Sequence, residues 1–275
     1  MVSLHRYPDQ AHPARQGLPG RRGRDASAVT DNTILIAGSA PCWPYGLFDN
    51  ISGLGAIAEK HDLWFHVDGC LGGFQSPFAE KLGHPLPVWD FRVPAVRSIS
   101  ADLHKHAYSA KPLSSITFRN ANWEKYHNCT PSDWPDGPYA TEAICGSTTA
   151  GSIASAWAVM KYLGEQGYLK LVQRSLDVQQ RYLTKLNAID GVECFPSDLC
   201  TMTVRPEKGL DLFAILGGLF ERQSYCLPSF QPPALKIVLD PVTDEVVDTF
   251  ARDLAEVVDL VRAGSVTIDS IAPYL

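Results

Sequence analysis

The stretch Ser98-Ile-Ser-Ala-Asp-Leu-His-Lys-His-Ala107 follows a short apolar run that begins at Val93, and it presents Lys105 between two histidines. A second apolar run upstream, Leu63-Trp-Phe-His-Val-Asp68, ends in one aspartate that small residues follow. Short, continuously apolar runs are typical of buried strands in a parallel sheet. The chain therefore predicts one strand that ends in Asp68 and a later strand that leads into Lys105.

A lysine and an aspartate at such strand ends suit pyridoxal 5'-phosphate (PLP). The lysine amine can form a Schiff base with the aldehyde of this cofactor, and a carboxylate can keep the pyridine nitrogen protonated. A lysine without such context is usually a surface residue, and a lone aspartate is often a helix cap. The residues in front of Lys105 and Asp68 favour the functional interpretation of both.

Several further motifs accompany these two in a fixed order. They are Gly38-Ser-Ala-Pro41, Tyr45-Gly46, His66-Val-Asp68, Gly72-Gly73-Phe74, Pro77-Phe78 and Ser98-Ile-Ser-Ala-Asp-Leu-His-Lys105. Together they resemble the PLP-dependent group II decarboxylase superfamily of fold type I, and their spacing is most similar to the sphingosine-1-phosphate lyase branch. The likeness is specific from about Thr33 to Ala158 and weaker to about Leu260.

The resemblance implies a set of site residues. Lys105 would be the catalytic lysine, and cofactor contacts are expected from His66, Asp68, Gly69, Ser100, Asp102, His104, Ser147 and Thr148. The segment 146–152 resembles one that reaches a phosphate across the dimer interface in the lyases, and Tyr139 could face the substrate. Two positions depart from the lyase pattern: Thr148 stands in place of an arginine, and His106 in place of a tyrosine. The loss of the arginine would weaken phosphate binding.

The resemblance also implies a glycine- and serine-rich phosphate cup and a histidine stacked on the cofactor before Thr33, which we do not find in residues 1–31. Three functions therefore remain open. The first is a carbon–carbon lyase that cleaves a phosphorylated 2-amino alcohol into an aldehyde and an amine. The second is an amino-acid decarboxylase, and the third is an inactive truncated remnant or a subunit that complements a longer partner. Lys105 and Asp68 serve the first two alike.

The expected fold is α/β: a three-layer, mostly parallel fold type I large domain, incomplete at its N-terminus, with a small α+β domain. The expected divisions are a disordered arm at 1–31, the large domain at 32–165, a bridging helix at 166–190 and the small domain at 191–275. Strands are predicted at 33–37, 63–67, 96–100 and 114–118, the last of which can run parallel or antiparallel, with a helix at 51–61 capped by Asp49. Later helices are predicted at 151–163 and 167–188, and one begins at Thr243.

Composition limits the remaining possibilities. The net charge of −6 gives no reason to expect nucleic-acid binding, and no apolar run is long enough to span a membrane. Seven scattered cysteines without a signal peptide favour free thiols in the cytoplasm, with Cys70 as a small packing residue. We expect a small-molecule amine as substrate, no metal, and a homodimer because the resembling family forms dimers.

Overall fold

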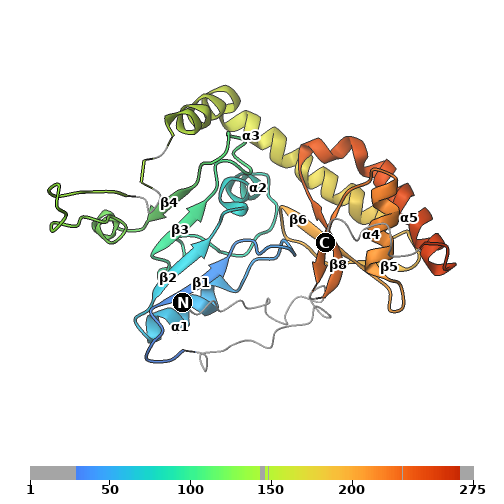
Figure 1. Cartoon of the computed structure of the whole chain (residues 1–275), viewed down its shortest axis with the longest axis horizontal. Coiled ribbons are helices and arrows are strands. Elements are labelled where there is room, and N and C mark those ends of the chain that lie inside the picture. The colour runs from blue at the N-terminus through green and yellow to red at the C-terminus, as the bar shows by residue number, and fades with distance from the viewer. Residues whose placement is uncertain (1–28, 143–145, 148, 231, 267–275) are drawn as a thin grey trace.

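The computed structural model describes residues 29–142, 146–147, 149–230 and 232–266. A four-stranded sheet occupies the first half, in the order β1 (Leu35–Ser39), β2 (Trp64–Asp68), β3 (Ser98–Ala101) and β4 (Ser115–Phe118). Strands β1 to β3 are parallel, and β4 returns antiparallel to β3 (Figure 1). The four strands predicted for this half are therefore confirmed, and the fourth does run antiparallel.

Helix α1 (Ile51–Lys60) packs against β1 and β2 through the buried side chains of Ile51, Leu54 and Ala58. The predicted cap, Asp49, is wrong. The Asn50 side chain caps the helix instead, accepting a 2.9 Å hydrogen bond from the Gly53 amide. Asp49 accepts a 2.7 Å hydrogen bond from the Ser39 amide, which ties the loop before α1 to the end of β1.

The segment after β2 is more helical than predicted. The sequence of residues 72–83 predicts a loop with about one helical turn, but the segment forms a short 3-10 helix, η3 (Gly72–Phe74), and then α2 (Ser76–Lys81). After β4, the chain forms η4 (Ala121–Tyr126) and a loop closed by an isolated bridge between Cys129 and Thr141. This loop projects away from the sheet (Figure 1).

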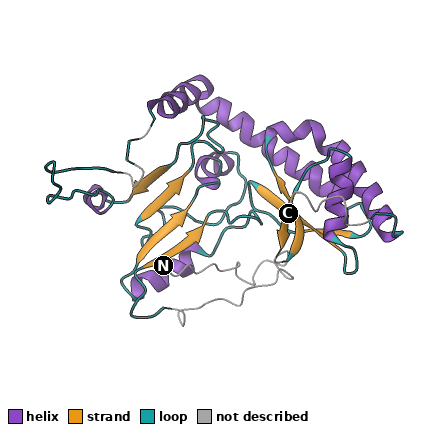
Figure 2. Ribbon diagram, viewed as in Figure 1, coloured by secondary structure: helices purple, strands orange, loops and turns teal. Residues whose placement is uncertain are grey.

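Helix α3 (Ala150–Leu186) contains the two predicted helices, 151–163 and 167–188, joined end to end, and the second ends two residues earlier than predicted. They meet at Gly164, whose φ of 56° and ψ of −174° are not helical. Only glycine adopts such a backbone conformation easily, so the chain changes direction there without a strained side chain. After this kink, Tyr168, Val172, Tyr182 and Leu186 are buried. The helix then runs from the first sheet to the second (Figure 2).

The second sheet is antiparallel, with the order β5 (Val192–Cys194), β6 (Thr201–Pro206), β8 (Pro233–Val238) and β7 (Leu227–Phe230). Strand β7 was not predicted. Its Pro228 lacks an amide proton and argues against a central strand, but proline is tolerated at a sheet edge, which is where β7 lies.

Helix α4 (Leu212–Glu221) packs on this sheet, and α5 (Val247–Arg262) packs against α4 and α3. The predicted start of the last helix at Thr243 is wrong, because residues Pro241–Val246 form a 3-10 helix, η5. Asp240 caps that 3-10 helix by accepting a 3.0 Å hydrogen bond from the Val242 amide. The α-helix begins only at Val247.

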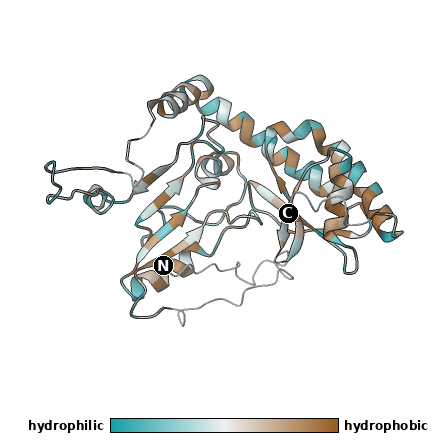
Figure 3. Ribbon diagram, viewed as in Figure 1, coloured by the Kyte–Doolittle hydropathy of each residue, from teal (hydrophilic) through white to brown (hydrophobic). Residues whose placement is uncertain are grey.

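The buried side chains form two clusters. One surrounds the first sheet and includes Ile36, Phe65 and Val67, and the other lies between the second sheet and helices α3 to α5. Figure 3 shows the corresponding hydrophobic residues along the strands and helices of both parts. An α/β fold with a separate α+β module is thus present, and the domain boundaries given above stay a prediction.

Three expectations concern the whole chain. Within the described residues, no helix is long and apolar enough to cross a membrane. Six cysteines fall in the same residues, and all six are free thiols. Most of the predicted disordered arm at 1–31 lies outside the described residues, which begin at 29.

Candidate cofactor site

The pairing of β2 with β3 brings the two predicted strand ends together. Asp68 is the register partner of Ser100, and on its other side Asp68 pairs with Ser39 of β1. Parallel strands end at one edge of a sheet, so side chains that follow them share that edge. The polar residues at 66–70 and 98–105 therefore meet there.

Asp68 is held in place by neighbouring donors. Its Oδ1 accepts a 3.0 Å hydrogen bond from the Cys70 amide and a 3.2 Å hydrogen bond from the Ser100 hydroxyl. In the part of the chain that the structure describes, Asp68 forms no salt bridge. An oriented carboxylate without a cationic partner is suited to pair with a protonated ring nitrogen.

Lys105 lies one turn beyond β3. Its Nζ is 2.9 Å from Oδ2 of Asp102, and the Cys70 thiol is within hydrogen-bonding reach of the same ammonium. Partial burial lowers the pKa of Lys105, but the contacts with Asp102 and Cys70 outweigh it, so the pKa is raised overall. Asp102 also accepts a 2.5 Å hydrogen bond from the Ser114 hydroxyl.

Three histidines lie near these charged groups: His104 near Asp102, His66 near Asp68, and His106 near Lys105. The Nδ1 of His104 lies 2.6 Å from the Leu113 carbonyl oxygen, and its Nε2 lies 3.6 Å from Oδ2 of Asp102. The Nδ1 of His66 contacts the Ser98 hydroxyl at 2.8 Å, and burial lowers the pKa of His66 although Asp68 opposes this. His106 is buried, and burial lowers its pKa as well.

Small residues let the segment after β2 pack closely against the end of β3. A side chain at Gly69 would place its Cβ 2.8 Å from the Ser100 carbonyl oxygen, and one at Gly73 would lie 2.5 Å from the Cβ of Ala101. The carboxylate of Asp68, which forms no ion pair among the described residues, and the amine of Lys105 are the two groups that pyridoxal phosphate requires.

The structure brings most of the predicted site residues together. Hydrogen bonds and close contacts link Asp68, His66 and Gly69 to Ser100, and link Lys105 and His104 to Asp102. Cys70 joins the two groups, because its thiol is within hydrogen-bonding reach of both Asp68 and Lys105. Their roles with the cofactor stay predictions.

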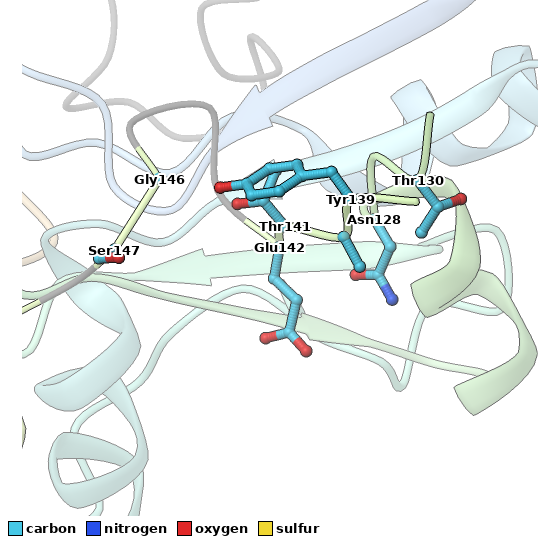
Figure 4. Close-up of a pocket in the computed structure, with 8 residues that line it drawn as sticks. Asn128, Thr130, Tyr139, Thr141, Glu142, Gly146 and Ser147 are labelled. Atoms are coloured by element: carbon cyan, nitrogen blue, oxygen red, sulfur yellow. The ribbon is translucent and has the colours of Figure 1, made fainter. Parts of the chain in front are cut away.

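Two other predicted residues lie elsewhere. Tyr139 and Ser147 line a cavity of about 420 Å³ in the loop after β4. Glu142 is its one charged lining residue among those described, and neither Lys105 nor Asp68 lines it. In Figure 4, Gly146 and Ser147 lie on one side of this cavity and Tyr139 on the other. Thr148 lies outside the described residues.

Sequence reasoning missed two residues that contact the candidate site, Cys70 and Ser114. Cys70 was interpreted as a packing residue, yet its partly exposed thiol is placed between Asp68 and Lys105. Its position two residues after the strand-end aspartate was the available signal. Ser114 binds Asp102 only because β4 folds back beside β3, and no local pattern indicates that contact.

Comparison with known proteins identifies the family of this chain. The model of the pyridoxal-dependent decarboxylase conserved domain matches residues 33–195. A sphingosine-1-phosphate lyase of Arabidopsis thaliana is 36% identical over 236 residues, which are 86% of this chain and 43% of that protein. An L-aspartate/L-glutamate decarboxylase of Pyrococcus horikoshii is 29% identical over 85% of this chain and 61% of its own length.

Solved structures show the same relationship. The sphingosine-1-phosphate lyase of Burkholderia pseudomallei superimposes with a TM-score of 0.81 at 33% identity, over 87% of this chain and 55% of its own. The glutamate decarboxylase of Lactobacillus brevis shares the fold, with a TM-score of 0.71 at 23% identity. The chain thus spans less than half the length of the Arabidopsis lyase. By its domain match and its fold, the chain belongs to the pyridoxal-dependent decarboxylase family, and its expected cofactor, pyridoxal phosphate, is the cofactor of that family.

Proposed function

We propose that this chain carries the lysine and aspartate half of a PLP-dependent carbon–carbon lyase. Its substrate would be a phosphorylated 2-amino alcohol, and its products an aldehyde and an amine. The proposal is supported mainly by the pairing of β2 with β3, together with the Cys70 thiol, which is within hydrogen-bonding reach of both Asp68 and Lys105. Similarity to lyases of 33–39% identity favours this substrate class.

Each residue has a distinct task in this proposal. The bound cofactor supplies an electron sink for the pair of electrons left when a bond at the amine-bearing carbon breaks. Asp68 would hold a proton on the ring nitrogen, since a carboxylate favours the cationic form of a base beside it. Lys105 would hold the cofactor covalently through Nζ, and Nζ would accept or return a proton when the substrate amine takes its place.

Cofactor attachment is the first test. PLP is added to the purified chain, the visible absorbance is recorded, and borohydride reduction is followed by peptide mass analysis. We expect a Schiff-base band, with the reduced cofactor on Lys105. The variant Lys105→Ala should lose both, and Lys111→Ala, six residues later, should keep both. Absence of the band from the wild-type chain at high PLP would contradict cofactor binding by this chain.

Substrate choice needs a separate assay. A phosphorylated sphingoid base is compared with glutamate, aspartate and aromatic amino acids, and aldehyde and carbon dioxide are measured in parallel. We expect aldehyde release from the phosphorylated base. Carbon dioxide release from the amino acids alone would instead support the decarboxylase alternative, which the 29% identity to the Pyrococcus decarboxylase keeps open.

We further propose that two copies assemble through the amino-terminal part of α3. Ile153, Trp157 and Met160 recur on one side of this helix, and their exposed fractions are 53%, 64% and 38%. Apolar side chains gathered on one exposed face are typical of a protein interface. Ser147, which lines the cavity with Tyr139, shortly precedes this helix in the sequence, so a second copy bound at the helix could receive Tyr139 and Ser147 at its own site.

A further inference from the structure

Asp102 is distinguished by the number of groups that converge on its carboxylate. Oδ2 lies 2.9 Å from Nζ of Lys105 and 3.6 Å from Nε2 of His104, and Oδ1 accepts the hydrogen bond from Ser114. The side chain of Asp102 is only 14% exposed, so water screens these charges less than at the surface. From this geometry we propose that Asp102 is a positioning residue that sets the protonation state of Lys105.

The contact has a defined chemical consequence. A carboxylate at hydrogen-bonding distance favours the ammonium form of an amine, and opposite charges this close shift a pKa by about one to three units. Lys105 must be neutral to attack an aldehyde carbon, but once released it must hold a proton in order to deliver it. Asp102 therefore favours the ammonium form of Lys105, which can deliver a proton, over the neutral amine, which attacks the aldehyde.

Ser114 orients this carboxylate. Its hydroxyl occupies Oδ1, which leaves Oδ2 directed to Lys105 and His104. Ser114 lies next to Ser115, the first residue of β4, and the antiparallel pairing of β4 with β3 holds both ends of the contact. The Nδ1 of His104 is engaged by the Leu113 backbone, so its Nε2 is the ring nitrogen that faces Asp102.

Other titratable groups also face Lys105. Cys70 lies within hydrogen-bonding reach, and His106 and the buried Cys200 lie within electrostatic range. Burial raises the pKa of both thiols, so they are neutral at pH 7 to 8 and do not supply the negative charge. Burial likewise keeps His106 in its neutral form. Asp102 is thus the anion among these neighbours of the lysine.

The inference rests on the proposed role of Lys105, but it can be tested without cofactor. Acetic anhydride labels neutral amines, and peptide mass spectrometry reports the labelling of each lysine as a function of pH. In Asp102→Asn, the pKa of Lys105 should fall by about one unit, which gives about tenfold faster labelling at pH 8. Asp102→Glu should restore slow labelling because it keeps the charge.

Matched controls separate charge from folding. Asp90→Asn removes a comparable 2.8 Å ion pair with Arg92, and it should leave the labelling of Lys105 unchanged. If Asp102→Asn has lost the cooperative urea unfolding transition of the wild-type chain, it has unfolded, and Ser114→Ala then decides. That variant keeps the charge but frees the carboxylate, so a smaller acceleration at Lys105 alone is expected.

Unchanged labelling of Lys105 in folded Asp102→Asn, or in Ser114→Ala where the first variant unfolds, would overturn the inference. A second readout uses the cofactor: borohydride-trapped PLP should accumulate faster at pH 7 in Asp102→Asn, because more of the amine is neutral. A failure of the inference about Asp102 can be distinguished from a failure of the proposed function. Faster labelling in a chain whose wild type never binds PLP would keep the role of Asp102 and remove the proposed function.

Discussion

The carboxylate of Asp198 accepts a 2.9 Å hydrogen bond from the backbone amide of Phe48, 150 residues earlier in the chain. This bond joins the loop after β1 to the loop before β6, and Phe48 and Leu199 lie in the same buried cluster. Around it, the Gly46 carbonyl accepts hydrogen bonds from the amides of Asp198 and Leu199. The rings of Tyr45 and Phe195 meet edge to face, with centroids 6.4 Å apart.

Gly46 is required at this junction for two reasons. Its φ is +68°, and a Cβ there would lie 2.1 Å from the Thr201 carbonyl oxygen. Gly46→Ala should reduce the free energy of unfolding by clearly more than the roughly 1–2 kcal/mol that a left-handed backbone alone costs. Gly264→Ala is the matched control, because its φ is +70° and no atom lies within 4 Å of the new Cβ. Urea unfolding of both variants measures the difference. Equal losses in the free energy of unfolding would show that the chain relieves the clash at Gly46 with little energetic cost.

The close contact between Gly73 and Ala101 can be tested by a compensating pair of substitutions. Gly73→Ala should destabilise the chain by about 1–3 kcal/mol, the usual cost of overpacking, and should weaken PLP attachment. Adding Ala101→Gly removes the atom that lies 2.5 Å from the new Cβ, so the double variant should recover part of both losses. Gly151→Ala, which meets only Thr149 Oγ1 at 3.5 Å, should be close to neutral. Unfolding curves and PLP titrations report both effects, and no recovery in the double variant would contradict the contact.

The exposed face of α3 should control assembly. Trp157→Glu places a charge among apolar neighbours, and we expect it to shift the chain from dimer to monomer in sedimentation velocity experiments. Tyr162→Glu changes a residue that is 89% exposed and lies on another side of the helix, so it should leave assembly unchanged. A wild-type chain that sediments as a monomer at high concentration would count against the proposed dimer.

Stability should decrease as the pH falls below about 6.5. Burial lowers the pKa of His106 in the folded chain, so the unfolded chain takes up a proton first, and the free energy of unfolding rises with pH across this range. One histidine contributes at most about 1.4 kcal/mol per pH unit. His106→Gln should reduce the slope between pH 5 and 7 in urea unfolding series, and His61→Gln, an exposed residue, should not. An unchanged slope in His106→Gln would show that the imidazole is protonated when folded.

The sequence by itself determined the elements whose evidence is local. Continuous apolar runs identified β1 to β4, and the strand-end positions of Asp68 and Lys105 identified the chemistry. Local patterns were less reliable at element ends. Asp49 and Asn50 are both good cap residues, and only the competing contact of Asp49 with Ser39 decides which of them serves α1.

Tertiary structure decided what depends on strand pairing and on contacts distant in sequence. The Ser114 contact with Asp102 requires the return of β4, and the bond between Phe48 and Asp198 requires two loops 150 residues apart to meet. The placement of Tyr139 and Ser147 away from Lys105 follows from a loop that projects from the sheet. Local patterns reflect each segment's own propensity and hydrophobic period, whereas these contacts form only when separate segments bury their apolar faces together.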